Sequence, residues 1–80
     1  NEKMMSTAEL GMAIAESLRY LGNANIPTAY VGNENVKLPT DDVILLYEIF
    51  EKLVENALSY LKAVYVKLEN AAGIVLKIKL

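Results

Sequence analysis

Four polar residues share one side of a predicted helix in the second half of the chain. They are spaced at i, i+4, i+7 and i+8, and they are Lys52, Asn56, Ser59 and Tyr60. Leu45 and Ile49 flank them along the same helix, so the asparagine lies in a second, partly apolar stripe. A buried amide without a hydrogen-bond partner costs about 1–3 kcal/mol. We therefore expect Asn56 to contact backbone, a neighbouring side chain, water or a ligand.

Other catalytic arrangements lack the residues that they need. The chain contains no histidine and no cysteine, so Ser6 and Ser59 have no imidazole to activate them as nucleophiles. Three glutamates on the predicted helix, Glu48, Glu51 and Glu55, fall opposite its apolar face. We expect them to be solvated, because carboxylates that act as acid and base need a cleft and differing environments.

The size and charge of the chain limit its function further. Eighty residues make a single domain, residues 1–80, whose stability must come from apolar packing because disulfides are impossible. Ten acidic residues against eight basic ones give a net charge of −2, spread along the chain. Neither nucleic acid nor an anionic membrane surface is therefore an expected partner. No apolar run approaches the roughly 20 residues that span a bilayer, which predicts a soluble segment.

The first half of the chain predicts a helix with a defined start and end. Ser6 and Glu9 form a capping box, in which the Ser6 hydroxyl accepts from the Glu9 N–H and the Glu9 carboxylate accepts from the Ser6 N–H. Apolar residues at three- and four-residue spacing predict a helix from about Thr7 to Leu21. Gly22 is expected to end it in the left-handed conformation.

A strand and a second helix are predicted next. Residues Ile26 to Val31 predict a strand that begins at Pro27 or lies at a sheet edge, because proline cannot donate to a ladder. Val36 to Pro39 is expected to be a short extended linker. Thr40 is a suitable N-cap for a helix from about Asp41 to Tyr60.

The second helix and the end of the chain complete the predicted fold. The broad apolar face of the helix is formed by Val43, Leu46, Tyr47, Phe50, Leu53, Val54, Ala57, Leu58 and Leu61. Val64 to Leu68 and Ile74 to Leu80 alternate apolar and polar residues, which predicts a β-hairpin with one buried face. The predicted class is α+β, a two-layer sandwich in the order helix, strand, helix, hairpin, with both helices on one face of a small sheet.

The segment from Leu38 to Tyr60 resembles the N-box helix of the GHKL, or Bergerat-fold, ATPases in the form found in sensor histidine kinases. It reads LPTDDVILLYEIFEKLVENALSY. The hairpin after it is similar to the two strands that follow that helix in the family. The preceding helix and strand also sit in the family's order, so the resemblance covers essentially the whole chain. It implies a truncated Bergerat-like fold, the partial ATPase-like domain of a two-component histidine kinase.

The resemblance also implies a nucleotide site. Asn56 matches the asparagine that coordinates the Mg²⁺ bridging the nucleotide phosphates, for which an amide oxygen is a suitable ligand. Lys52, Ser59 and Tyr60 stand at further nucleotide-binding positions. The implied parent is cytoplasmic, or the cytoplasmic part of a membrane-anchored protein. It uses ATP and Mg²⁺ to phosphorylate a histidine and has a response regulator as its partner.

Departures from the family pattern limit what this chain can do alone. Lys52 replaces the usual Glu or Asn, and an ammonium cannot ligate Mg²⁺. The Asp-x-Gly-x-Gly box, the glycine-rich lid and a phosphoacceptor histidine do not occur in residues 1–80. The isolated chain is therefore expected to have no catalytic residue, no phosphotransferase activity and no bound cofactor.

A different class of function stays open beside the kinase. The strand from Ile74 to Leu80 would be an unpaired edge if the missing half of the sheet normally covered it, and such edges associate with other strands. This indicates a non-catalytic interaction module, with a homodimer through the Ile74–Leu80 edge as its simplest form.

Overall fold

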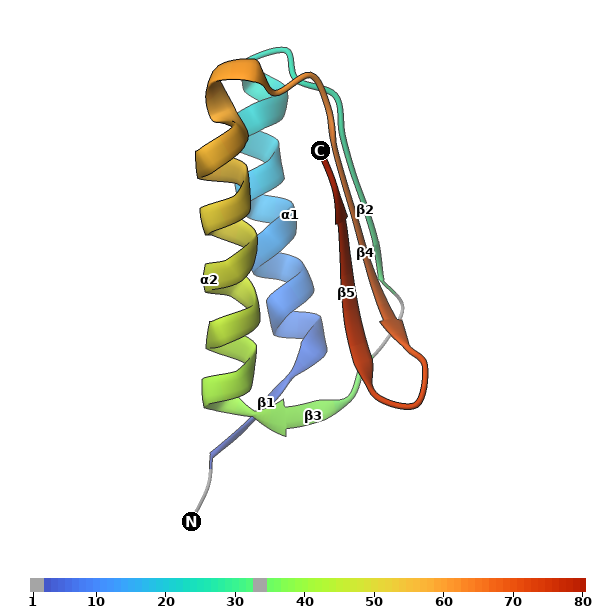
Figure 1. Cartoon of the computed structure of the whole chain (residues 1–80). Coiled ribbons are helices and arrows are strands. Elements are labelled where there is room, and N and C mark those ends of the chain that lie inside the picture. Colours follow the sequence, from blue (N-terminus) through green and yellow to red (C-terminus); the bar gives the residue numbers. More distant parts are fainter. Residues whose placement is uncertain (1–2, 33–34) are drawn as a thin grey trace.

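Two helices lie against one face of a small mixed sheet in the computed structural model, which describes residues 3–32 and 35–80 (Figure 1). In chain order the elements are β1 (Met4–Ser6), α1 (Thr7–Asn23), β2 (Thr28–Gly32), β3 (Lys37–Pro39), α2 (Thr40–Ala57), η1 (Leu58–Tyr60), β4 (Val64–Asn70) and β5 (Ile74–Lys79). The predicted α+β class and the order helix, strand, helix, hairpin are confirmed. The antiparallel pairing of β1 with β3 was not predicted. The sequence indicated only an extended linker where β3 lies.

The three-stranded sheet has the order β2, β4, β5. β2 runs parallel to β4, with Thr28 opposite Val64, and β4 runs antiparallel to β5, with Leu68 opposite Leu76. Parallel neighbours need a long crossover, which β3 and α2 provide here. The sequence predicted that this strand begins at Pro27 or lies at a sheet edge. Both statements are true, because β2 begins directly after Pro27 and lies at the edge of the sheet.

The start of α1 is held by Ser6, although not through the predicted capping box. Ser6 Oγ accepts a hydrogen bond from the backbone N–H of Ala8 at 3.1 Å, one residue earlier than predicted. Thr7 is fully buried; its N–H donates to the Val36 carbonyl at 2.9 Å, and the Val36 N–H donates to Thr7 Oγ1 at 3.0 Å. These bonds fasten the first turn of α1 to the chain that enters β3.

The helix ends differ from prediction. α1 continues past Gly22, and the left-handed residue that follows it is Asn25, with φ 63°. Asparagine tolerates this conformation because its short polar side chain bonds locally. α2 begins at Thr40 without a side-chain cap and ends at Ala57, where η1 continues as a 3-10 helix. In the part of the chain that the structure describes, no helix is long and apolar enough to cross a membrane.

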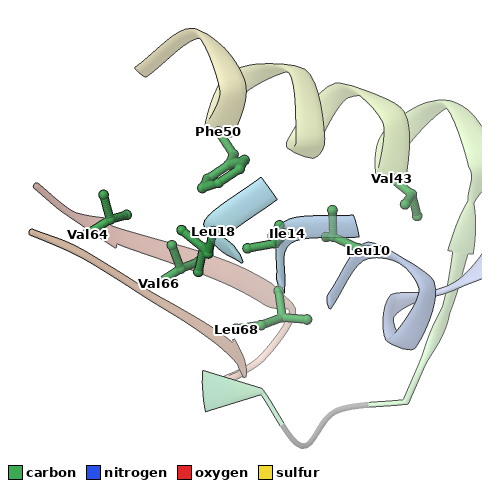
Figure 2. Packing of buried hydrophobic residues seen from close by; sticks show 8 residues of the cluster. All are labelled: Leu10, Ile14, Leu18, Val43, Phe50, Val64, Val66 and Leu68. Carbon is green, nitrogen blue, oxygen red and sulfur yellow. The ribbon is translucent and has the colours of Figure 1, made fainter. Parts of the chain in front are cut away.

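The core lies between the two helices and the central strand β4 (Figure 2). Its buried cluster consists of Leu10, Ile14, Leu18, Val43, Phe50, Val64, Val66 and Leu68. Every second residue of β4 points into it, as the predicted alternation requires. Two residues predicted to lie in the core, Leu53 of α2 and Leu58 of η1, are instead 42% and 53% exposed. The neighbours of α2, which are α1, the sheet and the β1–β3 pair, cover a narrower arc of the helix than its apolar residues occupy.

Candidate functional site

The four polar residues lie at the end of α2 and in η1. Lys52 and Asn56 are one turn apart on α2, and both are exposed. Ser59 and Tyr60 belong to η1, and Tyr60 is 72% exposed. A 3-10 helix turns by about 120° per residue rather than about 100°. Lys52 therefore stays beside Asn56, whereas Ser59 and Tyr60 are rotated relative to the predicted stripe.

Asn56 lies on the side of α2 that faces away from α1. On the other side, the Tyr47 hydroxyl and the Ser17 hydroxyl of α1 share a hydrogen bond at 2.6 Å. Ile49 follows Tyr47 by two residues, so it lies about 160° away around the helix. The side of α2 that includes Ile49 is exposed, and we call it the open flank. It consists of Leu45, Ile49, Leu53 and Asn56.

The Asn56 amide is exposed rather than half-buried, which corrects the prediction made from its apolar neighbours. Within residues 3–32 and 35–80 it makes no hydrogen bond or ion pair. The penalty for an unsatisfied buried amide therefore does not arise. A role in fastening the helix to the sheet is excluded for the described residues, and the amide oxygen is accessible to a ligand from solvent.

The surface of α2 favours cations. The helix carries five acidic residues and one basic residue, Lys52, and such a surface attracts cations and repels bare phosphate. Among the described residues, no three His, Cys, Asp or Glu side chains are grouped so that they could hold a metal ion. Mg²⁺ takes about six oxygen ligands. A Mg²⁺ ion at Asn56 would therefore draw most of its ligands from water or phosphate.

Asn56 lines none of three cavities that lie on the described part of the chain. One of ≈390 Å³ adjoins Tyr30, and another of ≈250 Å³ is a groove between α1 and α2 on the side of Glu51 and Leu58. A third, of ≈230 Å³, lies at the end of α2 and is lined by Ala57, Tyr60, Leu61, Lys62 and Leu80. Of the four polar residues, only Tyr60 lines any of these three cavities. Asn56 therefore lies on exposed surface outside these three cavities.

An ionic cluster that the sequence analysis missed lies on the sheet face away from the helices. Glu69 of β4 accepts from Lys67 Nζ at 3.0 Å and from Lys77 Nζ at 3.1 Å. Hydrogen bonds from Lys67 and then Lys77 lower the pKa of the Glu69 carboxyl, and Glu69 raises the pKa of the Lys67 ammonium. The two lysines are directly opposite in the ladder. The Glu69 carboxylate therefore offsets the repulsion between the two lysines. The alternation and register of the hairpin in the sequence could have revealed this cluster.

Comparison with known proteins adds no relative of known function. No family model, curated protein or solved structure matches the chain. The function is therefore argued from the residues and the fold.

Proposed function

We propose that this chain is the front part of the ATP-binding domain of a sensor histidine kinase, in which Asn56 binds the Mg²⁺ that bridges the nucleotide phosphates. One observation carries the proposal: Asn56 stands near the end of a long helix that leads through η1 into a β-hairpin. The resemblance of residues 38–60 to the N-box helix calls for an asparagine at this position. An amide oxygen accessible to solvent suits that role.

The order of the elements supports the proposal. The resemblance calls for a helix and a strand before the N-box helix and a hairpin after it, and the chain has that order. α2 is held by Val43 and Phe50, which are 3% and 1% exposed, so its position over the sheet does not depend on its polar residues. A site residue on such a packed helix is held more precisely than one on a loop.

Lys52 gives the proposed site a different character from the family pattern. The Lys52 ammonium cannot ligate Mg²⁺. Because Lys52 lies one helical turn before Asn56, its ammonium can instead pair with a phosphate oxygen. The hydroxyls of Ser59 and Tyr60 can donate hydrogen bonds to phosphate as well. Because the rest of α2 is acidic, we infer that the nucleotide binds as its Mg²⁺ complex rather than as the free anion.

The proposed reaction of the parent is transfer of the γ-phosphoryl group of ATP to a histidine nitrogen. The bond between the γ-phosphorus and the bridging oxygen breaks, a P–N bond forms, the imidazole gives up its N–H proton, and ADP leaves. Residues 1–80 contain no histidine, so the acceptor lies outside them. We infer that the 80-residue chain binds nucleotide weakly and does not catalyse the transfer. The parent would act in the cytoplasm, or in the cytoplasmic part of a membrane-anchored protein, on a response regulator.

A nuclear magnetic resonance titration of the 80-residue chain with ATP and Mg²⁺ tests this proposal. We expect amide shift changes confined to the region of Lys52 and Asn56, with a dissociation constant of about 1 mM because half of the pocket is absent. Asn56→Ala should abolish the changes. Asn23→Ala, which removes an exposed asparagine at the end of α1, should leave them unaltered.

Three results would contradict the proposal. They are equal shift changes in the Asn56→Ala variant, no shift changes at Lys52 and Asn56, and micromolar affinity of the isolated chain, which a half-built pocket cannot supply. Replacing Mg²⁺ by Mn²⁺ gives an independent readout. The paramagnetic ion should broaden the Asn56 side-chain signals only when ATP is present.

A further inference from the structure

The outer edge of β5 has no strand partner in the described part of the chain. β5 pairs only with β4, through residues 74–79, so the backbone groups on its other side are open for pairing. Its inward residues, Ile74, Leu76 and Ile78, pack on the core but remain half-buried. Unpaired edges of this kind attract further strands.

The open flank of α2 lies above the same edge. α1 packs on β2 at the far side of the sheet, and Figure 1 shows α2 and β5 in front of α1 and β2. The flank faces away from α1, and its three apolar residues, Leu45, Ile49 and Leu53, are 55%, 45% and 42% exposed. A strand edge and an apolar helix side are thus left uncovered on one side of the molecule.

We propose that a second copy of this chain covers both surfaces. Two β5 strands would pair antiparallel about a twofold axis at Leu76, which joins the two sheets into one of six strands. Because that axis is perpendicular to the sheet, both α2 helices lie on the same face of the joined sheet. They run antiparallel, and the open flank of one helix packs against the open flank of the other. The open flank includes Asn56, so in the 80-residue chain this contact would compete with the proposed nucleotide site for that residue.

The sequence of β5 is self-complementary in this register. Leu76 would lie opposite Leu76 of the second copy, Ile74 opposite Ile78, and Val75 opposite Lys77. All inward residues then meet apolar residues, and no like charges are opposed. A shift of one residue would place apolar residues opposite polar ones on the wrong face.

Shifts of two residues are disfavoured for other reasons. A register centred on Lys77 opposes two ammonium groups, which is destabilising. A register centred on Val75 places Ile78 opposite Ala72, outside the strand, and loses an apolar pair. Edge lysines usually discourage pairing, but Lys77 is held by Glu69 at 3.1 Å on the outer face. The register centred on Leu76 is therefore the one that the residues favour.

The layer spacings are compatible with this arrangement. Paired strands lie about 4.8 Å apart, and packed helices lie about 8–10 Å apart. Each α2 axis would then stand about 4–5 Å from the twofold axis, half of the spacing between packed helices. Leu45, Ile49 and Leu53 of each copy would then interdigitate, and the strand ladder and the helix contact would form together.

Sedimentation equilibrium of the 80-residue chain over about 10 μM to 1 mM tests the dimer, within the range of weak and moderate protein association. We expect a monomer–dimer equilibrium and no larger species, because a twofold contact closes on itself. Ile49→Lys should weaken the dimer about tenfold or more, because it introduces a charge on each side of the axis. Ile44→Lys is the matched control. Ile44 is 47% exposed on the same helix but lies on the other side, so this variant should dimerise like the parent chain.

Disulfide trapping tests the register, since the chain has no cysteine of its own. Leu76→Cys should oxidise to a covalent dimer, and Val75→Cys and Lys77→Cys should not. A monomer at every concentration, larger oligomers, or an Ile49→Lys dimer as tight as the parent would overturn the proposal. Trapping through Lys77→Cys in place of Leu76→Cys would overturn the register. Circular dichroism of each variant establishes that a monomeric result does not come from unfolding.

Discussion

The hydroxyl end of Tyr30 lies so close to Gly11 that a methyl group on Gly11 would not fit beside it. A Cβ atom on Gly11 would be 2.7 Å from Tyr30 Oη. Gly32, two residues after Tyr30 on β2, leaves room for the same hydroxyl end. Glycine inside a helix is about 1 kcal/mol less favourable than alanine. The close approach of α1 to β2 at Tyr30 explains why glycine stands at position 11.

Two glycine variants of α1 should therefore change stability in opposite directions. Gly22→Ala meets no atom within 4 Å, so it should raise the free energy of unfolding by about 0.5–1 kcal/mol. Gly11→Ala should lower it by about 1–3 kcal/mol, as overpacking does. Urea unfolding followed by circular dichroism measures both. Tyr30→Phe should reduce the penalty of Gly11→Ala, and an equal penalty in both backgrounds would contradict the explanation.

Tyr30 should make the protein sensitive to alkaline pH. Burial raises the pKa of its hydroxyl above the ordinary value of 10.0. The folded state thus retains the proton more strongly, and its advantage is present below pH 10 and lost as the pH rises through the folded pKa. Tyr30→Phe should flatten the fall of Tm above pH 10, the ordinary pKa of tyrosine. Tyr20→Phe, which alters a tyrosine that is 71% exposed, should leave that fall unchanged.

Glu69 should stabilise the sheet in a manner that depends on salt and acid. Its pKa is lowered from the ordinary 4.5 by Lys67 and Lys77. The stabilisation is therefore present above pH 4.5 and is lost as the pH falls through the folded pKa. At neutral pH and low salt, Glu69→Gln should lower the urea midpoint, because the two lysines then repel each other. High salt should narrow the difference. Glu55→Gln on α2 is the control, and an equal effect of both variants would exclude the cluster as the cause.

The hydrogen bond between Ser17 and Tyr47 should couple the two helices. The hydroxyl oxygens are 2.6 Å apart, and the Tyr47 ring packs against Phe50 with centroids 5.9 Å apart. Ser17→Ala and Tyr47→Phe should each lower the free energy of unfolding by about 0.5–1.5 kcal/mol. The double variant should cost clearly less than the two single costs together, because both changes remove the same bond. Additive costs in a denaturation cycle would show that the bond does not contribute.

Lys52 should influence nucleotide binding without influencing stability. The residue is exposed on α2, so Lys52→Glu should change the free energy of unfolding by no more than about 0.5 kcal/mol. If Lys52 contacts the nucleotide phosphates as proposed, Lys52→Glu should bind Mg²⁺ more tightly, because it replaces a positive charge by a negative one. It should bind ATP more weakly in the absence of Mg²⁺, because the new carboxylate repels the phosphates. Magnetic resonance titrations with each ligand alone measure both affinities. Unchanged affinities would remove Lys52 from the site.

The amino-acid sequence determined the kinds of elements and their order. Alternating residues from Val64 to Leu68 and from Ile74 to Leu80 specify a hairpin, and the three- and four-residue apolar spacing specifies both helices, because these patterns depend only on local geometry. Pro27 likewise predicted that its strand either lies at a sheet edge or begins at the proline. The sequence also singled out Asn56, on the expectation of a partly buried amide that the structure corrects.

Tertiary structure alone decided which of these surfaces are covered. Two strand pairings join segments that are far apart in the chain: the parallel pairing of β2 with β4 and the antiparallel pairing of β1 with β3. No local sequence pattern predicts either of them. Leu53 and Asn56 are exposed because, among the described residues, α1, the sheet and the β1–β3 pair leave that side of α2 uncovered. Periodicity shows which side of a helix is apolar. How much of that side is buried depends on the number and position of its neighbours, which only the folded chain contains.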